Sequence, residues 1–182
     1  MLGHVLSPSS PVAYFYFDYQ DHIVQTPGSV LNCILRQLIE IMPAIPKSVT
    51  DLHTRLSGTK DSLPLHECER LIMEVVRESR CSYLILDAFD ECDDLTYRKA
   101  FLQIIDRISH APNFRILITS RLHTQDICQA LSNYPQLTIK ARGEDIKTYL
   151  RQELIRGGIY ELVGNQFPTK LMERLPERAD GM

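Results

Sequence analysis

The stretch LILDAFDECDD, residues 84–94, places three apolar residues directly before a run of carboxylates. Asp87 ends the apolar part, and four more acidic residues follow it: Asp90, Glu91, Asp93 and Asp94. Like charges packed this closely repel one another and resist removal from water. The cluster is therefore either a loop solvated by water or a site where a cation and a phosphate chain hold part of it.

Apolar segments alternate with amphipathic segments along the chain. Strands are predicted over VAYFYF (12–17), SYLILDA (82–88), RILITS (115–120) and QLTIKA (136–141). Apolar residues at helical spacing predict helices over 29–42, 65–76, 97–109 and 124–131, and a further helix begins with EDIKTYLRQEL (144–154). Between the first two helices, a segment with Pro46 and Gly58 is predicted to be a polar loop.

Apolar strands separated by helices are typical of a parallel sheet that is covered on both faces. Such sheets bind ligands beyond the carboxyl ends of their strands. Here Asp87 to Glu91 follow one strand, and Thr119 to Arg121 follow the next. We expect these carboxylates, hydroxyls and guanidinium to face one crevice. This combination suits phosphate and metal chemistry better than hydride or acyl transfer.

The composition argues against several classes of function. A net charge of −3 provides no basic field for nucleic acid. The longest uncharged run, MLGHVLSPSSPVAYFYF, is broken by prolines and serines, so no membrane segment is expected. Five cysteines without a CxxC pair predict reduced thiols in a cytoplasmic chain. The six histidines lack the spacing of a zinc site.

Taken together, these segments resemble a known family. LILDAFDEC is similar to the Walker B segment of NACHT-type NTPases, in the STAND branch of P-loop ATPases and GTPases, and RILITSR is similar to their sensor 1 strand. VAYFYFDYQD, the ILRQLI helix and the closing ERADGM resemble the NACHT modules of fungal NLR-like receptors, which ankyrin or WD-type repeats often follow. The same segment is described as a nephrocystin-3-like N-terminal domain. The resemblance implies an α/β fold, a three-layer P-loop NTPase core with a parallel sheet.

The resemblance also implies roles for four residues. Asp87 would orient Mg²⁺ through a water molecule. Asp90 and Glu91 would be the catalytic carboxylates that position the water attacking the γ-phosphate of ATP or GTP. Arg121 would bind that phosphate with its guanidinium. From spacing alone, a solvated acidic turn and a surface arginine remain the alternatives.

One part of the family pattern is missing. The phosphate-binding loop G-x-x-x-x-G-K-[ST] requires a Gly-Lys pair, and the sequence contains none. We therefore expect an internal piece of a longer protein, with residues 1–141 forming an incomplete NTPase core and 142–182 starting a truncated helical domain. In this fold the missing strand lies between the sensor 1 strand and the last strand. RILITS should then lose a neighbour, and QLTIKA should lack a partner.

Three hypotheses stay open. The first is a fragment of a nucleotide-dependent signalling switch, unable to bind or hydrolyse nucleotide alone. In the complete parent domain its cofactors would be Mg²⁺ and ATP or GTP, and its protein partners would act through repeat or effector domains. The second is a degenerate scaffold or interaction module that binds no nucleotide and self-associates. The third is a truncated gene model without independent function. Neither nucleic acid nor membrane is an expected partner.

Overall fold

The computed structural model describes residues 10–42, 44–56, 63–93, 96–140 and 143–158. The chain divides into two compact units, residues 1–133 and 134–182. In the first unit, three strands form a parallel sheet in the order β1-β2-β3, with β1 at Val12–Tyr16, β2 at Ser82–Asp87 and β3 at Phe114–Ile118. The predicted parallel sheet is confirmed for these three strands.

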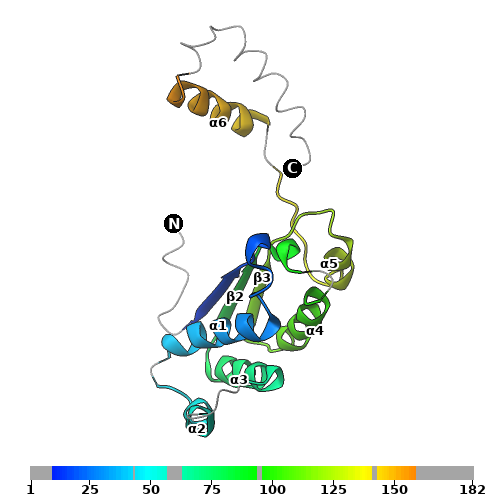
Figure 1. Ribbon diagram of the computed structural model, residues 1–182. Coiled ribbons are helices and arrows are strands. Elements are labelled where there is room, and N and C mark those ends of the chain that lie inside the picture. Colours follow the sequence, from blue (N-terminus) through cyan, green and yellow to red (C-terminus); the bar gives the residue numbers. More distant parts are fainter. Residues whose placement is uncertain (1–9, 43, 57–62, 94–95, 141–142, 159–182) are drawn as a thin grey trace. The chain divides into compact units, whose positions relative to one another are not determined.

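Helices occupy the connections between these strands. Helices α1 (Pro27–Glu40), α2 (Lys47–Leu56) and α3 (Leu65–Glu78) lie between β1 and β2, and α4 (Arg98–Ser109) lies between β2 and β3. Figure 1 shows β2 between its two neighbours, with α1, α3 and α4 packed beside the strands. Short 3-10 turns follow the first two strands, η1 at Tyr19–Asp21 and η2 at Phe89–Glu91. Helix α5 (Gln125–Ala130) follows β3, and α6 (Gly143–Arg156) belongs to the second unit. None of the helices in the described part of the chain has the length and apolar character that a membrane crossing requires.

The strands appear in the sheet in the same order as in the sequence. Because parallel crossovers are nearly always right-handed, strands added in one direction place all their connecting helices on one face. The fully buried sheet residues belong to that face and are mostly apolar: Ala13, Ser82, Leu84, Leu86 and Phe114. On the opposite face, Tyr14, Tyr16 and Leu117 are exposed by 51%, 62% and 57%. The predicted third layer is therefore absent from the described residues 10–133, where only one face of the sheet is covered.

A cluster of phenylalanines lies beneath the carboxyl ends of the strands. Phe17 packs edge-on against Phe89 and Phe101, with ring centroids 5.3 and 5.6 Å apart. Phe89 and Phe101 are also edge-on, at 6.2 Å. Because Phe89 lies in η2 and is fully buried, it anchors the turn that carries the acidic residues to the core.

Two predicted elements are wrong. The segment predicted as a polar loop contains α2, whose Val49 and Leu52 lie three residues apart and turn toward the core, with Leu52 only 7% exposed. Two apolar side chains on one helical face outweigh the polar composition of this segment. The strand predicted over 136–141 is not formed over the described residues 136–140, where Leu137 and Ile139 are 85% and 83% exposed. A strand forms only beside a paired strand, and the described sheet consists of β1, β2 and β3.

Burial raises the pKa of the Cys68 thiol to about 11, well above its ordinary value near 9. Its sulfur donates to Asn32 Oδ1 at 3.1 Å, inside the α1–α3 contact. The raised pKa means that folding favours the neutral thiol, so this contribution to stability is complete below pH 9 and lost as the pH rises through 11.

At pH 9, iodoacetamide should label exposed Cys33 and spare Cys68, whereas both should react in urea. Equal labelling rates in the native chain, measured by mass spectrometry, would contradict this buried position.

A lysine should destabilise the protein on one face of β3 and have little effect on the other. Ile116→Lys should cost roughly 3 kcal/mol or more of unfolding free energy, because Ile116 packs against the core and an unpaired ammonium cannot be buried there. Leu117→Lys should change stability by less than about 0.5 kcal/mol, because Leu117 lies on the open face. Urea denaturation measures both variants. A large loss for Leu117→Lys would mean that something covers the open face.

Candidate functional site

The carboxyl ends of β2 and β3 are joined by a side-chain hydrogen bond. Thr119, directly after β3, donates its hydroxyl to Asp87 Oδ1 at 2.5 Å. The two backbones are also linked, because Thr119 N donates to Leu86 O at 2.9 Å. On the other side of β2, Phe17 N donates to Asp87 O at 3.0 Å. Asp87 therefore lies at the centre of the strand ends, held from both neighbouring segments.

The chain leaves β2 through a left-handed turn. Ala88 has φ 52° and ψ 44°, a conformation that costs a residue with a Cβ about 1 kcal/mol. Thr119 accepts two hydrogen bonds that hold the turn. Its hydroxyl accepts from Ala88 N at 3.0 Å, and its carbonyl accepts from Phe89 N at 2.9 Å. This turn directs η2 across the end of β3, which brings Asp90 and Glu91 toward Arg121.

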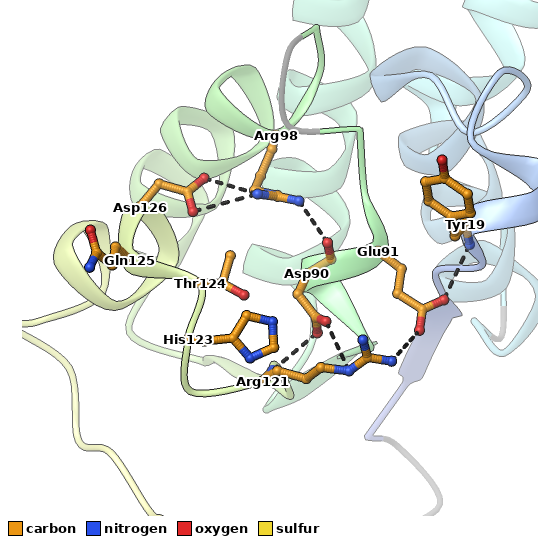
Figure 2. Close-up of a pocket in the computed structure, with 9 residues that line it drawn as sticks. All are labelled: Tyr19, Asp90, Glu91, Arg98, Arg121, His123, Thr124, Gln125 and Asp126. Atoms are coloured by element: carbon orange, nitrogen blue, oxygen red, sulfur yellow. Dashed lines mark hydrogen bonds and ion pairs between the residues drawn. The ribbon is translucent and has the colours of Figure 1, made fainter. Parts of the chain in front are cut away.

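Arg121 is held by both carboxylates of η2. Its backbone N–H donates to Asp90 Oδ1 at 3.1 Å, and its Nε lies 3.5 Å from Asp90 Oδ2. Its Nη2 donates to Glu91 Oε1 at 3.2 Å, while the other Glu91 oxygen accepts from Tyr19 N at 3.2 Å. Figure 2 shows the guanidinium between the two acidic side chains. The Asp90 side chain is only 8% exposed, whereas the Arg121 side chain is 66% exposed.

These groups line a pocket of about 690 Å³ beyond the carboxyl ends of the strands. Its wall comes from η1, η2, the start of α4 and the segment that leads into α5, and its residues are Tyr19, Asp90, Glu91, Arg98, Arg121, His123, Thr124, Gln125 and Asp126. The pocket is mostly polar and contains three acidic and two arginine side chains. Such a lining suits a charged or strongly polar ligand better than an apolar one.

Three of the four predicted site residues meet in this pocket: Asp90, Glu91 and Arg121. Asp87 is outside the lining, next to Thr119. The expectation that all these groups face one crevice is therefore met for Asp90, Glu91 and Arg121, whereas Asp87 and Thr119 pair outside the pocket. Their roles toward metal and nucleotide remain predictions. Asp18, two residues after the end of β1, accepts from Gln20 N at 2.8 Å and caps η1.

The sequence interpretation missed Arg98. This residue begins α4, yet its side chain is 8% exposed and donates to the carbonyls of Asp90 and Cys92. One signal was available in the sequence, because a basic residue in the first turn of a predicted helix opposes the helix dipole.

The residues fit one half of a magnesium–nucleotide site. Asp87, Asp90 and Glu91 offer the carboxylate oxygens that Mg²⁺ prefers, and Arg121 offers a guanidinium suited to phosphate. In the described ranges, no group of three or more His, Cys, Asp or Glu side chains could hold a metal ion by itself. The phosphate cradle does not fit, because the sequence has no Gly-Lys pair. No hydrolysis step can therefore be derived from these residues alone.

Residues 1–121 match the family model described as Nephrocystin 3, N-terminal. The chain belongs to this family. The match covers 121 of 182 residues and ends at Arg121, so it includes all four predicted site residues. The expected likeness to nephrocystin-3-like N-terminal domains is confirmed. A search of curated proteins found no match to the chain.

The Thr119 hydroxyl should be required for the geometry of the strand ends. Thr119→Val should lower the free energy of unfolding by about 1 kcal/mol, because Asp87 Oδ1 and Ala88 N both lose their partner. Thr119→Ser keeps the hydroxyl and should stay close to the unsubstituted chain. Ser120→Ala is the neighbouring control, since within the described residues its hydroxyl donates to Arg121 O at 3.1 Å and makes no bond to β2. Equal urea midpoints for Thr119→Val and Ser120→Ala would contradict the assignment.

Proposed function

We propose that this chain carries the metal- and phosphate-facing strand ends of a nucleotide-dependent signalling switch of the NACHT (STAND) type. The observation that supports this most directly is the hydrogen bond from Thr119 to Asp87 at adjacent strand ends, with Arg121 two residues further on. A metal-orienting carboxylate and a phosphate-binding guanidinium at neighbouring strand ends suit phosphoryl chemistry. The setting we propose is a cytoplasmic NLR-like receptor of the fungal kind, whose repeat or effector domains would contact protein partners.

Arg121 is free enough to exchange its partner. Its guanidinium is largely exposed, and exposed ion pairs contribute about 0–1 kcal/mol. A phosphate group carries more negative charge than Glu91 and accepts a bidentate contact from a guanidinium, so an anion placed at the strand ends would compete with Glu91 for Arg121. Glu91 would then be free to orient water, while Asp90, which is more deeply buried, would keep the Arg121 backbone in place.

Nucleotide binding by this sequence alone should be weak. A P-loop supplies several backbone N–H donors and one lysine to the phosphates, and none of these is present. The proposed switch therefore needs a phosphate cradle from residues other than those in this sequence. Asp87 and Arg121 by themselves offer one cation contact and one anion contact.

Manganese can report on Asp87 without nucleotide. Titration of Mn²⁺ into the ¹⁵N-labelled chain should broaden the amide signals of residues 86–88 and 119–121, with an affinity on the order of millimolar for a site with so few carboxylates. Asp87→Asn should abolish the broadening, whereas Asp51→Asn, which changes an exposed carboxylate on α2, should leave it intact. Added Mg-ATP or Mg-GTP at sub-millimolar concentration should give no saturable melting shift.

Two results would count against the proposal. Broadening that persists in Asp87→Asn, or never appears at the strand ends, would remove the metal role of Asp87. A clear melting shift with nucleotide would show that binding does not need the missing cradle.

The second candidate function is a scaffold or self-association module that binds no nucleotide. The open face of the sheet favours it, because Tyr14, Tyr16 and Leu117 form an exposed apolar surface. The coding sequence before Met1 separates the two candidates. An apolar strand followed by a loop ending in Gly-Lys-Ser or Gly-Lys-Thr would favour the switch, and an intact in-frame region without it would favour the scaffold.

A further inference from the structure

Arg98 occupies a position that its own helix does not favour. It is the first residue of α4, where the partial positive charge of the helix N-terminus repels a cation. Its side chain is nevertheless only 8% exposed, although a buried guanidinium loses most of its hydration. A lysine or arginine that served only solubility would point into water. The reason for Arg98 must therefore lie in the groups that it contacts.

Those groups come from two other segments of the chain. Arg98 Nη2 donates to Asp90 O at 2.6 Å and to Cys92 O at 2.7 Å, so one nitrogen holds the backbone on both sides of Glu91. Arg98 Nη1 lies 3.3 and 3.5 Å from the two carboxylate oxygens of Asp126 on α5. In Figure 2 the guanidinium lies between η2 and the start of α5.

The arrangement is not optimised for stability alone. Arg98 Nε is buried and has no hydrogen-bond partner in the described part of the chain, which leaves a polar group unsatisfied. Among the described residues its charged partner is Asp126, which is 49% exposed and therefore compensates the buried charge weakly. A site built only to stabilise the core would place an apolar side chain here, since buried ion pairs are often replaceable at no loss.

Contacts among Arg98, Asp90, Arg121 and Asp126 form a continuous chain around the pocket. Arg98 holds the Asp90 carbonyl, the Asp90 carboxylate holds the Arg121 N–H, and five residues later Asp126 returns to Arg98. Within the described residues Arg98 makes no hydrogen bond with Arg121, so any effect on Arg121 passes through Asp90 or Asp126. A shift of the segment 121–126 would therefore be transmitted to the turn that carries Glu91.

We propose that Arg98 is the positioning residue of this site: it holds the Asp90–Cys92 backbone in place and couples it, through Asp126, to the segment that carries Arg121. The proposal rests on the proposed function for the meaning of the site, but its structural test does not require metal or nucleotide. Arginine is needed because its planar guanidinium reaches two carbonyls and a carboxylate at once, and an ammonium cannot.

The test is amide hydrogen exchange, resolved by residue, in variants of the whole chain. Arg98→Lys should speed exchange at the Glu91, Cys92 and Arg121 amides about tenfold, while core amides such as Leu84 and Ile104 change little. Acceleration at Arg121 is the informative readout, because Arg98 does not contact that amide. Asp126→Asn keeps Arg98 and its carbonyl bonds, so it should fold normally and give a smaller acceleration at the same three amides.

Arg107→Lys is the matched control. It also lies on α4 and loses a two-bond contact, with Glu69 at 2.6 and 2.9 Å, but it is far more exposed and outside the pocket. Its effect on the three site amides should be negligible. Unchanged exchange at Arg121 in both Arg98→Lys and Asp126→Asn would overturn the proposal. So would equal acceleration of site and core amides in both variants, because it would show a purely stabilising role.

The two proposals fail separately. If the Mn²⁺ broadening does not depend on Asp87, the proposed function fails, and the hydrogen-exchange pattern still decides the role of Arg98. If Mn²⁺ binds at Asp87 and the exchange pattern is absent, Arg98 has no positioning role and the proposed function stands.

Discussion

Parallel pairing of β2 with both of its neighbours determines where the site is formed. The register sets Tyr16 opposite Asp87 and Leu86 opposite Ile118, so the residues that follow all three strands emerge at one edge. Phe17 N and Thr119 N continue the pairing by one hydrogen bond on each side. The apolar contact of Phe89 with Phe17 and Phe101 then keeps the first turn after β2 attached to the core. Without that pairing, the carboxylates and Arg121 would be unrelated loop residues.

The carboxylates of Asp87, Asp90 and Glu91 are tolerated close together because hydrogen-bond donors and a cation lie between them. Asp87 accepts from the Thr119 hydroxyl, and Asp90 and Glu91 share the Arg121 guanidinium. Arg98 adds a second positive charge beneath the turn. Like charges that would repel as a bare cluster are thus separated by cations and donors from three other segments. The carboxylates are therefore stabilised by groups of the chain itself, in addition to any water or bound cation.

The errors of the sequence interpretation share a cause. Segment 47–56 looks like a loop because most of its residues are polar, but a few apolar side chains at helical spacing suffice when a core is near. Segment 136–140 looks like a strand because its residues have β propensity, but propensity alone does not form a strand outside the sheet of β1, β2 and β3. The three-layer expectation assumed helices on both sides, whereas strands in sequential order with right-handed crossovers place them on one. Each error concerns the tertiary neighbours of a segment, which the residues of that segment do not determine.

The sequence by itself determined the strands β1, β2 and β3, the amphipathic helices that cover them, and the edge where polar residues collect, because periodicity and apolar runs are local properties. It also indicated that Asp90, Glu91 and Arg121 belong together, since the carboxyl ends of parallel strands share an edge. Only the tertiary structure decided that Arg121 is held by both carboxylates, that Asp87 pairs with Thr119 outside the pocket, and that Arg98 lies beneath the turn. These contacts join residues up to 32 positions apart, and their geometry depends on the left-handed turn at Ala88 and on the packing of α4 and α5. Neither of these has a signature in a short stretch of sequence.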